Sequence, residues 1–377
     1  MKIGFYSSRP LEDKKNWSGT MYKMYEQMLL HGHEIVWIPK VEYTSKEEKR
    51  FEQIERTFNK VFKRNYNKHL FYYKAKIASK RLKKTIKGLD IDLLFVPTYV
   101  NDIVFLNIKQ PIVYLNDANV VQLFNYYTYY MGLGFLTKLE SKYLEKKMLQ
   151  NVDVAVFSSD WASNYAIEEY GIEKDKVRTI KFGANLEVPE SIQSNKRSDV
   201  FTFLFLAVEW KRKRGQLAYE SLKILKEKGY PIEMLIVGCN PDIKEDWVTI
   251  IPFLNKNVPQ EFAEIQRHLL ESHLLFVPTE ADCTPIAFCE AAAYGLPTIS
   301  TNTGGVAAHI EHLKTGVLLP SKAKAEEYAK AIEETYLLST ENIQIHGKNA
   351  RLKYEKELNW KAFGQALNEV ITKFEKE

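Results

Sequence analysis

Short runs of apolar, often β-branched residues alternate along the whole chain with longer stretches whose apolar residues recur at helical spacing. Such runs, when helices separate them, are typical of parallel strands that are covered on both faces. The pattern therefore predicts an α/β fold built from doubly wound parallel sheets. The predicted strands are 3–7, 34–38, 92–96, 112–114, 154–157 and 177–180 in the first half, and 201–207, 233–237, 247–251, 274–278, 298–301 and 317–319 in the second.

A polar, aperiodic stretch at residues 187–200 divides this alternation into two halves of similar size and is predicted to be a linker. We therefore expect two α/β domains with a cleft between them, covering residues 1–190 and 200–355. The remaining residues, 356–377, contain apolar positions at helical spacing. This last segment is expected to form a helix that packs back on the first domain.

The length and composition fit a soluble protein of two domains. The chain has 377 residues, of which 45% are hydrophobic and 27% are charged, and these values are close to the average of globular proteins. None of its apolar stretches reaches the roughly 20 residues of a membrane-spanning helix. The first residues are predicted to form a strand and not a signal peptide. The expected location is the cytoplasm.

The cysteines and glycines disfavour several kinds of site. Cys239, Cys283 and Cys289 lack paired spacing, so we expect neither a disulfide framework nor a metal site. The chain also lacks the glycine-rich motifs of dinucleotide-binding enzymes and of P-loop nucleotidases.

Positive charge is concentrated in one segment. The net charge is +5, but residues 46–87 hold 15 Lys and Arg against 4 Glu, a local +11, so the rest of the chain sums to −6. One interpretation is a solvated helical face. Its buried stripe would consist of Phe51, Phe58, Phe62, Leu70 and Tyr73. The other is a surface that meets anionic lipid headgroups at the inner membrane face, or an anionic acceptor. Nucleic acid is disfavoured as a partner, because the charge comes without a nucleic-acid-binding motif.

Two acidic residues, Asp282 and Glu290, stand with seven residues between them just after a predicted buried strand. The order predicts a strand, a loop and a short helix, with one carboxylate in the loop and the other about two turns into the helix. Ligands of open α/β sheets bind at the carboxyl ends of strands, and a helix N-terminus there offers N–H groups to an anion. The spacing therefore predicts a binding site.

A basic loop, residues 211–214, follows the first strand of the second half and is closed by Gly215. Its four cations could neutralise a phosphate chain, although such a charge run can also be simply solvated. Both this loop and the Asp282–Glu290 loop are predicted to leave the same edge of one sheet. Their shared position favours the phosphate-binding interpretation.

These motifs, in this order, resemble those of the family 4 glycosyltransferases, and the resemblance covers nearly the whole chain. In the second half it rests on residues 208–215, 282–297 and 303–305, and in the first half on 17–20, 158–162 and 181–185. The family implies a GT-B fold, in which two Rossmann-like domains face a central cleft. The second domain would hold a nucleoside-diphosphate sugar, most commonly a UDP-sugar, and the first would face the acceptor.

The resemblance also implies a reaction. Sugar would be transferred, with retention at the anomeric carbon and without a metal or cofactor, to a hydroxyl group of a glycan, lipid-linked or protein acceptor. Arg212 and Lys213 match the basic pair that stabilises the departing diphosphate. Glu290 matches the carboxylate that binds the ribose, and Asp282 matches the acid beside the transferred sugar.

Further residues are assigned to donor binding by the same resemblance. Gly19 would let the loop after the first strand approach the donor phosphates closely, with Thr20 beside it. In the acidic loop, the donor would contact Thr284, Pro285 and Ile286.

The chain departs from the family pattern at several positions. Position 282 is Asp where Glu is commoner, and Pro285 stands where glycine is frequent, which removes an N–H donor. The catalytic-site histidine that many members carry after the fourth strand is absent. Asp117 is our candidate there, in contact with sugar or acceptor, with a structural turn role as the alternative. A non-catalytic partner subunit, and a nucleotide-sugar hydrolase or epimerase of the same fold, therefore remain alternative functions.

Overall fold

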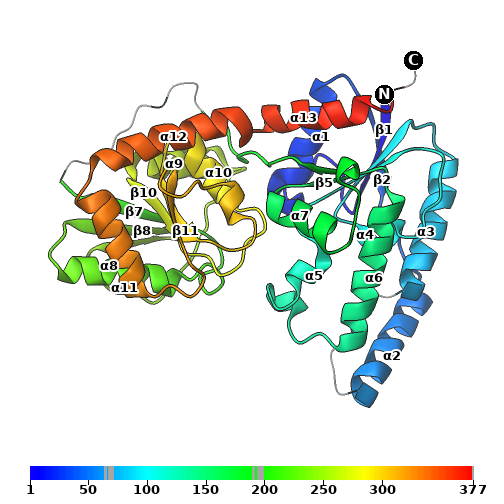
Figure 1. Ribbon diagram of the computed structural model, residues 1–377, viewed down its shortest axis with the longest axis horizontal. Coiled ribbons are helices and arrows are strands. Elements are labelled where there is room, and N and C mark those ends of the chain that lie inside the picture. The colour runs from blue at the N-terminus through cyan, green and yellow to red at the C-terminus, as the bar shows by residue number, and fades with distance from the viewer. Residues whose placement is uncertain (63–65, 67–71, 189–191, 193–198, 376–377) are drawn as a thin grey trace. The chain divides into compact units, whose positions relative to one another are not determined.

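The computed structural model describes residues 1–62, 66, 72–188, 192 and 199–375 (Figure 1). It divides into two compact units: unit 1 is Met1–Ile180 with Phe363–Glu377, and unit 2 is Lys181–Ala362. A six-stranded sheet of parallel-paired strands lies in each unit. The twelve predicted strands are confirmed, with ends that differ by at most two residues.

The sheet of unit 1 has the strand order β2-β1-β3-β4-β5-β6. Because β1 lies between β2 and β3, the order reverses at β1, and ligands of open α/β sheets bind at such a point. The strands are β1 (Lys2–Ser7), β2 (Glu34–Pro39), β3 (Leu93–Pro97), β4 (Ile112–Asn116), β5 (Val154–Phe157) and β6 (Val177–Thr179). The helices are α1 (Thr20–Leu30), α2 (Ser45–Phe62), α3 (Tyr72–Lys87), α4 (Val100–Ile103), α5 (Val120–Leu123), α6 (Phe135–Asn151) and α7 (Asp160–Glu168).

Close packing around β1 requires a glycine. A Cβ atom at Gly4 would lie 2.7 Å from the Cδ1 atoms of both Ile38 and Ile91. A larger residue at this position would therefore displace the side chains of these two isoleucines. On the neighbouring position, Phe5 packs edge to face against Phe95 of β3, with ring centroids 5.0 Å apart. These contacts hold β1 at the reversal point of the sheet.

The last helix, α13 (Trp360–Thr372), contributes its residues from Phe363 onward to unit 1. Phe363, Leu367 and Ile371 recur at helical spacing and are at most 1% exposed, so they form its buried face. His33 Nε2 lies 2.8 Å from Asn368 Oδ1. This contact joins the residue before β2 to the helix.

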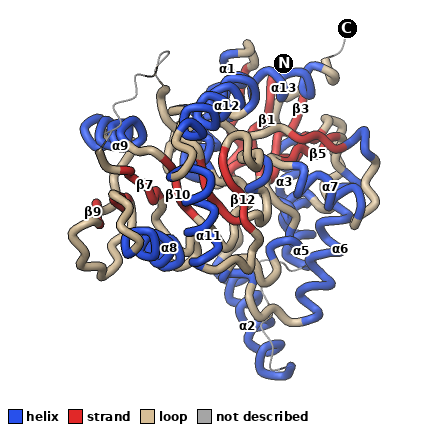
Figure 2. The backbone as a smooth tube through the Cα atoms, turned by 60° about the vertical axis from the view of Figure 1, so that its left-hand side comes forward, coloured by secondary structure: helices blue, strands red, loops and turns tan. Residues whose placement is uncertain are grey.

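The sheet of unit 2 has the strand order β12-β11-β10-β7-β8-β9, which reverses between β7 and β10. Its strands are β7 (Phe201–Leu206), β8 (Ile232–Val237), β9 (Val248–Ile251), β10 (Leu274–Val277), β11 (Thr298–Thr301) and β12 (Gly316–Leu319). Its helices are α8 (Gly215–Glu227), α9 (Pro259–Glu271), α10 (Ile286–Ala293), α11 (Ala325–Ile332) and α12 (Glu341–Glu357). Helices α8 and α11 pack together on one face of the sheet, and α10 and α12 pack together on the other (Figures 1 and 2).

The basic segment predicted at residues 46–87 forms α2 and α3 in its described parts. Phe51 is buried, but Phe62 is 54% and Tyr73 is 42% exposed. The expected buried stripe is therefore wrong at Phe62 and Tyr73, because helical spacing reveals an apolar stripe but not whether another element covers it. Leu70 of that stripe lies outside the described residues.

Most of the predicted linker also lies outside the described part of the chain. Within the described ranges, none of the helices has both the length and the apolar composition that a bilayer crossing requires.

Candidate active site

Two loops at the carboxyl edge of the unit 2 sheet are joined by direct contacts. Lys213, in the loop after β7, forms an ion pair with Asp282, in the loop after β10. Arg212 Nη1 donates a hydrogen bond to the carbonyl oxygen of Ala281 at 2.7 Å, and the N–H of Glu280 donates to the carbonyl oxygen of Arg212 at 2.9 Å. The structure therefore brings the predicted basic and acidic loops together at the point where the strand order reverses.

The ion pair between these loops is shielded from water. The side chains of Lys213 and Asp282 are only 13% and 9% exposed. Opposite charges attract more strongly when solvent is excluded than they do on an open surface. An anion that entered this site would compete with Asp282 for the same ammonium group.

The shape of the basic loop depends on a tight turn into α8. Arg214 precedes the helix with a positive φ of 51°, a conformation that costs energy for a residue with a side chain. At Gly215, the first residue of α8, a Cβ atom would overlap the Trp210 ring. Trp210 also packs edge to face on Phe205 at 5.1 Å. Trp210 therefore packs inside unit 2, and its packing sets the path of the four cations between Trp210 and Gly215.

The second predicted carboxylate has a partner that was not identified from the sequence. Glu290 lies in α10, is 1% exposed and forms an ion pair with Lys256, from the segment between β9 and α9. The Lys256 side chain is 35% exposed. The only signal in the sequence is that Lys256 follows a strand of the same sheet, which does not reveal which carboxylate it reaches. Lys256 is thus an additional cation beside the predicted site.

The three residues Thr284, Pro285 and Ile286 connect the two carboxylates. Pro285 stands directly before α10 with an extended backbone, and its carbonyl oxygen accepts a hydrogen bond from the N–H of Phe288 at 2.9 Å. The short turn places Asp282 in the loop and Glu290 within the helix, as the spacing predicts.

A third loop, which follows β11, is hydrogen-bonded to the loop that contains Asp282. The N–H of Gly305 donates to the carbonyl oxygen of Asp282 at 3.0 Å. Gly304 has a φ of 53°, in the left-handed region that glycine favours. His309 is 3% exposed, and burial lowers its pKa to about 4, so its imidazole is neutral at physiological pH. Three consecutive loops of the sheet edge are therefore tied together.

The first-half candidates lie in unit 1. Trp17, Ser18 and Gly19 have positive φ values of 47°, 56° and 89°, and Thr20 begins α1. Backbone strain of this kind often persists at binding sites, and successive N–H groups in such turns can form an anion-binding concavity. The predicted loop after β1 thus has a conformation compatible with phosphate binding.

Asp117 follows β4, and its N–H donates to Asn116 Oδ1 at 3.0 Å. A polar cavity of about 290 Å³ lies at the same edge of the unit 1 sheet. Its lining includes the polar and charged side chains of Lys40, Lys74, Asp102, Asn116 and Glu145. These cavity residues were not identified from the sequence, because they come from five separate segments of unit 1.

Two carboxyl groups of this cavity are deeply buried. Burial raises the pKa of Asp102, and the Tyr6 hydroxyl donates to its Oδ2 at 2.9 Å. Burial raises the pKa of Glu145 to about 7. The Glu145 carboxyl group accepts hydrogen bonds from the Tyr170 hydroxyl at 2.5 Å and from the N–H of Val120. Titratable groups perturbed in this way are common at functional sites.

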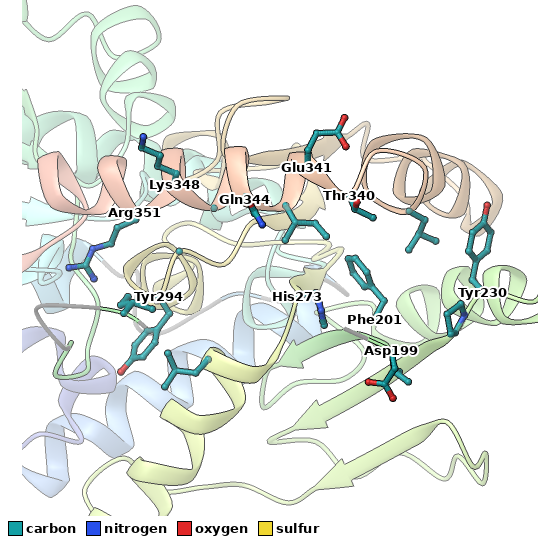
Figure 3. Close-up of a pocket in the computed structure, with 18 residues that line it drawn as sticks. Asp199, Phe201, Tyr230, His273, Tyr294, Thr340, Glu341, Gln344, Lys348 and Arg351 are labelled. Carbon is teal, nitrogen blue, oxygen red and sulfur yellow. The ribbon is translucent and has the colours of Figure 1, made fainter. Parts of the chain in front are cut away.

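A larger cavity in unit 2 lies away from the paired loops. It measures about 1040 Å³ and includes Phe201, His273, Tyr294 and Arg351 in its lining (Figure 3). Phe201 is the first residue of β7, so this cavity lies at the amino edge of the sheet, opposite the basic and acidic loops. Its size therefore does not make it the candidate active site.

The structure thus places the predicted site residues in two groups. Unit 2 holds Arg212, Lys213, Asp282, Thr284, Pro285, Ile286 and Glu290, and unit 1 holds Gly19, Thr20 and Asp117. Among the residues that the structure describes, no three or more His, Cys, Asp or Glu side chains cluster in a way that could hold a metal ion.

Comparison with known families agrees with this architecture. The family model of the glycosyl transferases group 1 matches residues 189–357, and the model of glycosyltransferase family 4 matches residues 20–188. The two matches are consecutive and correspond to the two halves of the chain. The protein belongs to the group 1, family 4 glycosyltransferases.

The chain is similar to the amylovoran biosynthesis glycosyltransferase AmsK of Erwinia amylovora, with 26% identity over 239 residues. The match covers 50% of this chain, and the chain spans only 56% of the length of AmsK. Among solved structures, sucrose-phosphate synthase of Thermosynechococcus elongatus superposes with a TM-score of 0.67 at 15% identity, covering 99% of this chain and 98% of that one. HepE of Anabaena, solved in complex with UDP and glucose, superposes with a TM-score of 0.60 at 12% identity, with 99% of each chain covered. These likenesses, with the two parallel sheets, establish a two-domain α/β fold of the GT-B class.

Proposed function

We propose that this protein is a retaining, metal-independent glycosyltransferase that moves a sugar from a UDP-sugar to a hydroxyl group during glycan biosynthesis. The observation that carries the proposal is the ion pair between Lys213 and Asp282, with Arg212 anchored to the same acidic loop. This arrangement sets cations and a carboxylate side by side at the sheet edge where α/β folds bind ligands. AmsK, a relative in amylovoran biosynthesis, and HepE, solved with UDP and glucose, support the pathway and the donor class.

The cations have a clear chemical task in this reaction. The bond between the anomeric carbon and the diphosphate breaks, and a bond from the acceptor oxygen forms. The acceptor proton leaves with the departing diphosphate. Negative charge develops on that leaving group, and Arg212 and Lys213 would stabilise it in place of a metal ion, because preorganised cations in a dry site reduce the barrier. The diphosphate would displace Asp282 from Lys213 and free that carboxylate to meet the sugar.

The buried Glu290 would hold the nucleoside. A carboxylate that is 1% exposed strongly prefers hydrogen-bond donors or a cation around it. Lys256 supplies the cation in the structure, and two ribose hydroxyl groups could replace it. The Gly19 loop of unit 1, with Thr20, would meet the donor phosphates through its strained backbone.

The polar cavity of unit 1 is the proposed acceptor site. Carboxyl groups and lysines are suited to the hydroxyl groups of a sugar, and Asp102 and Lys74 are among those in its lining. Asp117, on the adjoining loop, would contact the sugar or the acceptor. We further propose that the protein works in the cytoplasm and contacts an anionic membrane peripherally through its basic residues 46–87.

The test is turnover of UDP-glucose, UDP-galactose, UDP-N-acetylglucosamine and GDP-mannose in the presence of EDTA, with the product anomer determined by NMR. We expect one UDP-sugar to be consumed with an unchanged anomeric configuration. A donor that binds without turnover would favour the non-catalytic partner. Release of free sugar at the same rate as the donor is consumed would favour a hydrolase. A failure of every donor to bind at millimolar concentration would reject the proposed function.

A further inference from the structure

Helix α6 of unit 1 carries an apolar stripe on its outward face. Phe135 is 72%, Leu136 46%, Leu139 49% and Tyr143 52% exposed. These positions recur at helical spacing on the side opposite the buried residues Ser141, Leu144, Glu145 and Met148. A surface helix normally turns polar residues to water. The outward stripe of α6 therefore has the composition of a face that a partner covers.

The end of α2 extends this apolar surface. Val61 is 64% and Phe62 is 54% exposed. A groove of about 600 Å³ between the two helices is lined by aromatic and apolar side chains, including Phe58, Phe62, Leu133, Phe135 and Leu136. The two helix ends lie side by side (Figure 1). Exposed apolar groups gathered in this way mark interaction sites on soluble proteins.

Positive charge surrounds the apolar stripe. Lys60, Lys142 and Lys146 are exposed beside it, and Lys138 lines the groove. Two acids of α6, Glu140 and Glu145, are turned to internal partners. Glu140 accepts hydrogen bonds from the Tyr66 hydroxyl and the Tyr72 N–H, both at 2.8 Å, and Glu145 is 1% exposed. The outer surface therefore combines apolar anchors with cations.

We propose that this surface, formed by Val61, Phe62, Phe135, Leu136, Leu139 and Tyr143 with its surrounding lysines, docks unit 1 on an anionic lipid bilayer. Apolar and aromatic side chains enter the headgroup boundary, while lysines extend to the lipid phosphates. A symmetric dimer would place this lysine-rich surface against itself, where the like charges repel. Charge complementarity therefore selects the bilayer.

The proposal goes beyond contact through the basic segment 46–87, because the larger part of the apolar surface lies on α6. The same helix also leads to the polar cavity of unit 1, which Ser141 and Glu145 help to line. Leu136 and Glu145 are nine positions apart, or about 14 Å along a helix. If the cavity holds the acceptor, which rests on the proposed function, docking of unit 1 brings the acceptor site close to the membrane surface.

Vesicle flotation of the full chain tests the proposal. We expect binding to vesicles of phosphatidylcholine that contain about 30 mol% phosphatidylglycerol, which gives a strong negative surface potential. Binding to vesicles of phosphatidylcholine alone should be at least tenfold weaker. The double variant Phe135→Ser/Leu139→Ser should lose at least tenfold of the anionic binding. The matched control Leu338→Ser/Ile345→Ser removes equally exposed apolar side chains from unit 2 and should bind like the wild type.

The charge contribution is measured separately with Lys138→Glu/Lys142→Glu, which should reduce the preference for anionic vesicles. Thermal unfolding checks that each variant is folded, and UDP binding on the same samples reports on unit 2 independently. Equal flotation of the α6 variant and the wild type would overturn the proposal, even if the glycosyltransferase function holds. A concentration-dependent dimer that the α6 substitutions abolish, without vesicle binding, would show that a second copy is the partner and would also overturn it.

Discussion

Lys256 and Glu290 form an ion pair in unit 2 in which the carboxylate is 1% exposed and the lysine side chain is 35% exposed. Removal of one partner of a buried pair typically costs about 3–5 kcal/mol, because the remaining charge is left without compensation. Since Lys256 is partly solvated, we expect Lys256→Met to lower the free energy of unfolding by about 2 kcal/mol.

UDP should rescue this variant if the ribose binds Glu290. The hydroxyl groups would then supply the hydrogen bonds that the lost ammonium provided, so the UDP-induced rise in Tm should be larger in Lys256→Met than in the wild type. Lys244 is the matched control, since its pair with Asp242 is almost fully exposed at 3.7 Å. A Lys256→Met variant with unchanged stability would contradict the structural role of the pair.

Lys213→Ala should abolish most of the turnover and leave unit 2 folded. Loss of one preorganised group that stabilises developing charge typically reduces kcat by about 10²–10³. The neighbouring Lys211 is exposed, and Lys211→Ala serves as the control, with kcat expected within about twofold of the wild type. Steady-state kinetics with the preferred donor distinguish the two variants. Equal activities would exclude Lys213 from the reaction.

Gly215→Ala should disturb the basic loop through a steric conflict with Trp210. Overpacking of this kind costs about 1–3 kcal/mol, and it should also reduce donor binding, because Arg212 and Lys213 lie between the two residues. Introducing Trp210→Leu should relieve the conflict. A double-mutant cycle of urea unfolding measures the coupling, and strictly additive effects would show that the ring does not limit position 215.

Glu145 should make stability depend on pH. Burial raises its pKa from 4.5 to about 7 in the folded protein, so the folded state binds the proton more tightly than the unfolded state. The resulting stability is fully present below about pH 4.5 and is lost as the pH rises to about 7, a total of roughly 3 kcal/mol.

Glu145→Gln keeps an acceptor for Tyr170 and Val120 but cannot ionise. The free energy of unfolding of the wild type, relative to that of the variant, should therefore be higher at pH 5 than at pH 7.5. Chemical denaturation at both pH values measures it. A difference that does not change with pH would show that Glu145 does not titrate in this range.

The sequence predicts the strands well because buried parallel strands are short apolar runs that need no tertiary information. The same holds for the loops after β7 and β10, whose meeting follows from strand order once a doubly wound sheet is assumed. Lys256 was missed because its pairing with Glu290 depends on the path of the segment between β9 and α9. Phe62 and Tyr73 were wrongly expected to be buried, since helical periodicity gives a stripe without saying what covers it. The cavity around Asp102 gathers residues from separate segments, and local pattern does not reveal such a gathering.

The central claim is that the loops after β7 and β10 grip a nucleoside diphosphate, with Lys213 on the phosphates and Glu290 on the ribose. Calorimetric titration with uridine, UDP and 2′,3′-dideoxy-UDP separates these contributions. We expect Lys213→Ala to lose most of the affinity gain from uridine to UDP and to keep the gain from dideoxy-UDP to UDP. Glu290→Gln should lose the gain from dideoxy-UDP to UDP and keep the gain from uridine to UDP. If both variants retained both gains, or if the wild type bound none of the three ligands, the claim would be contradicted.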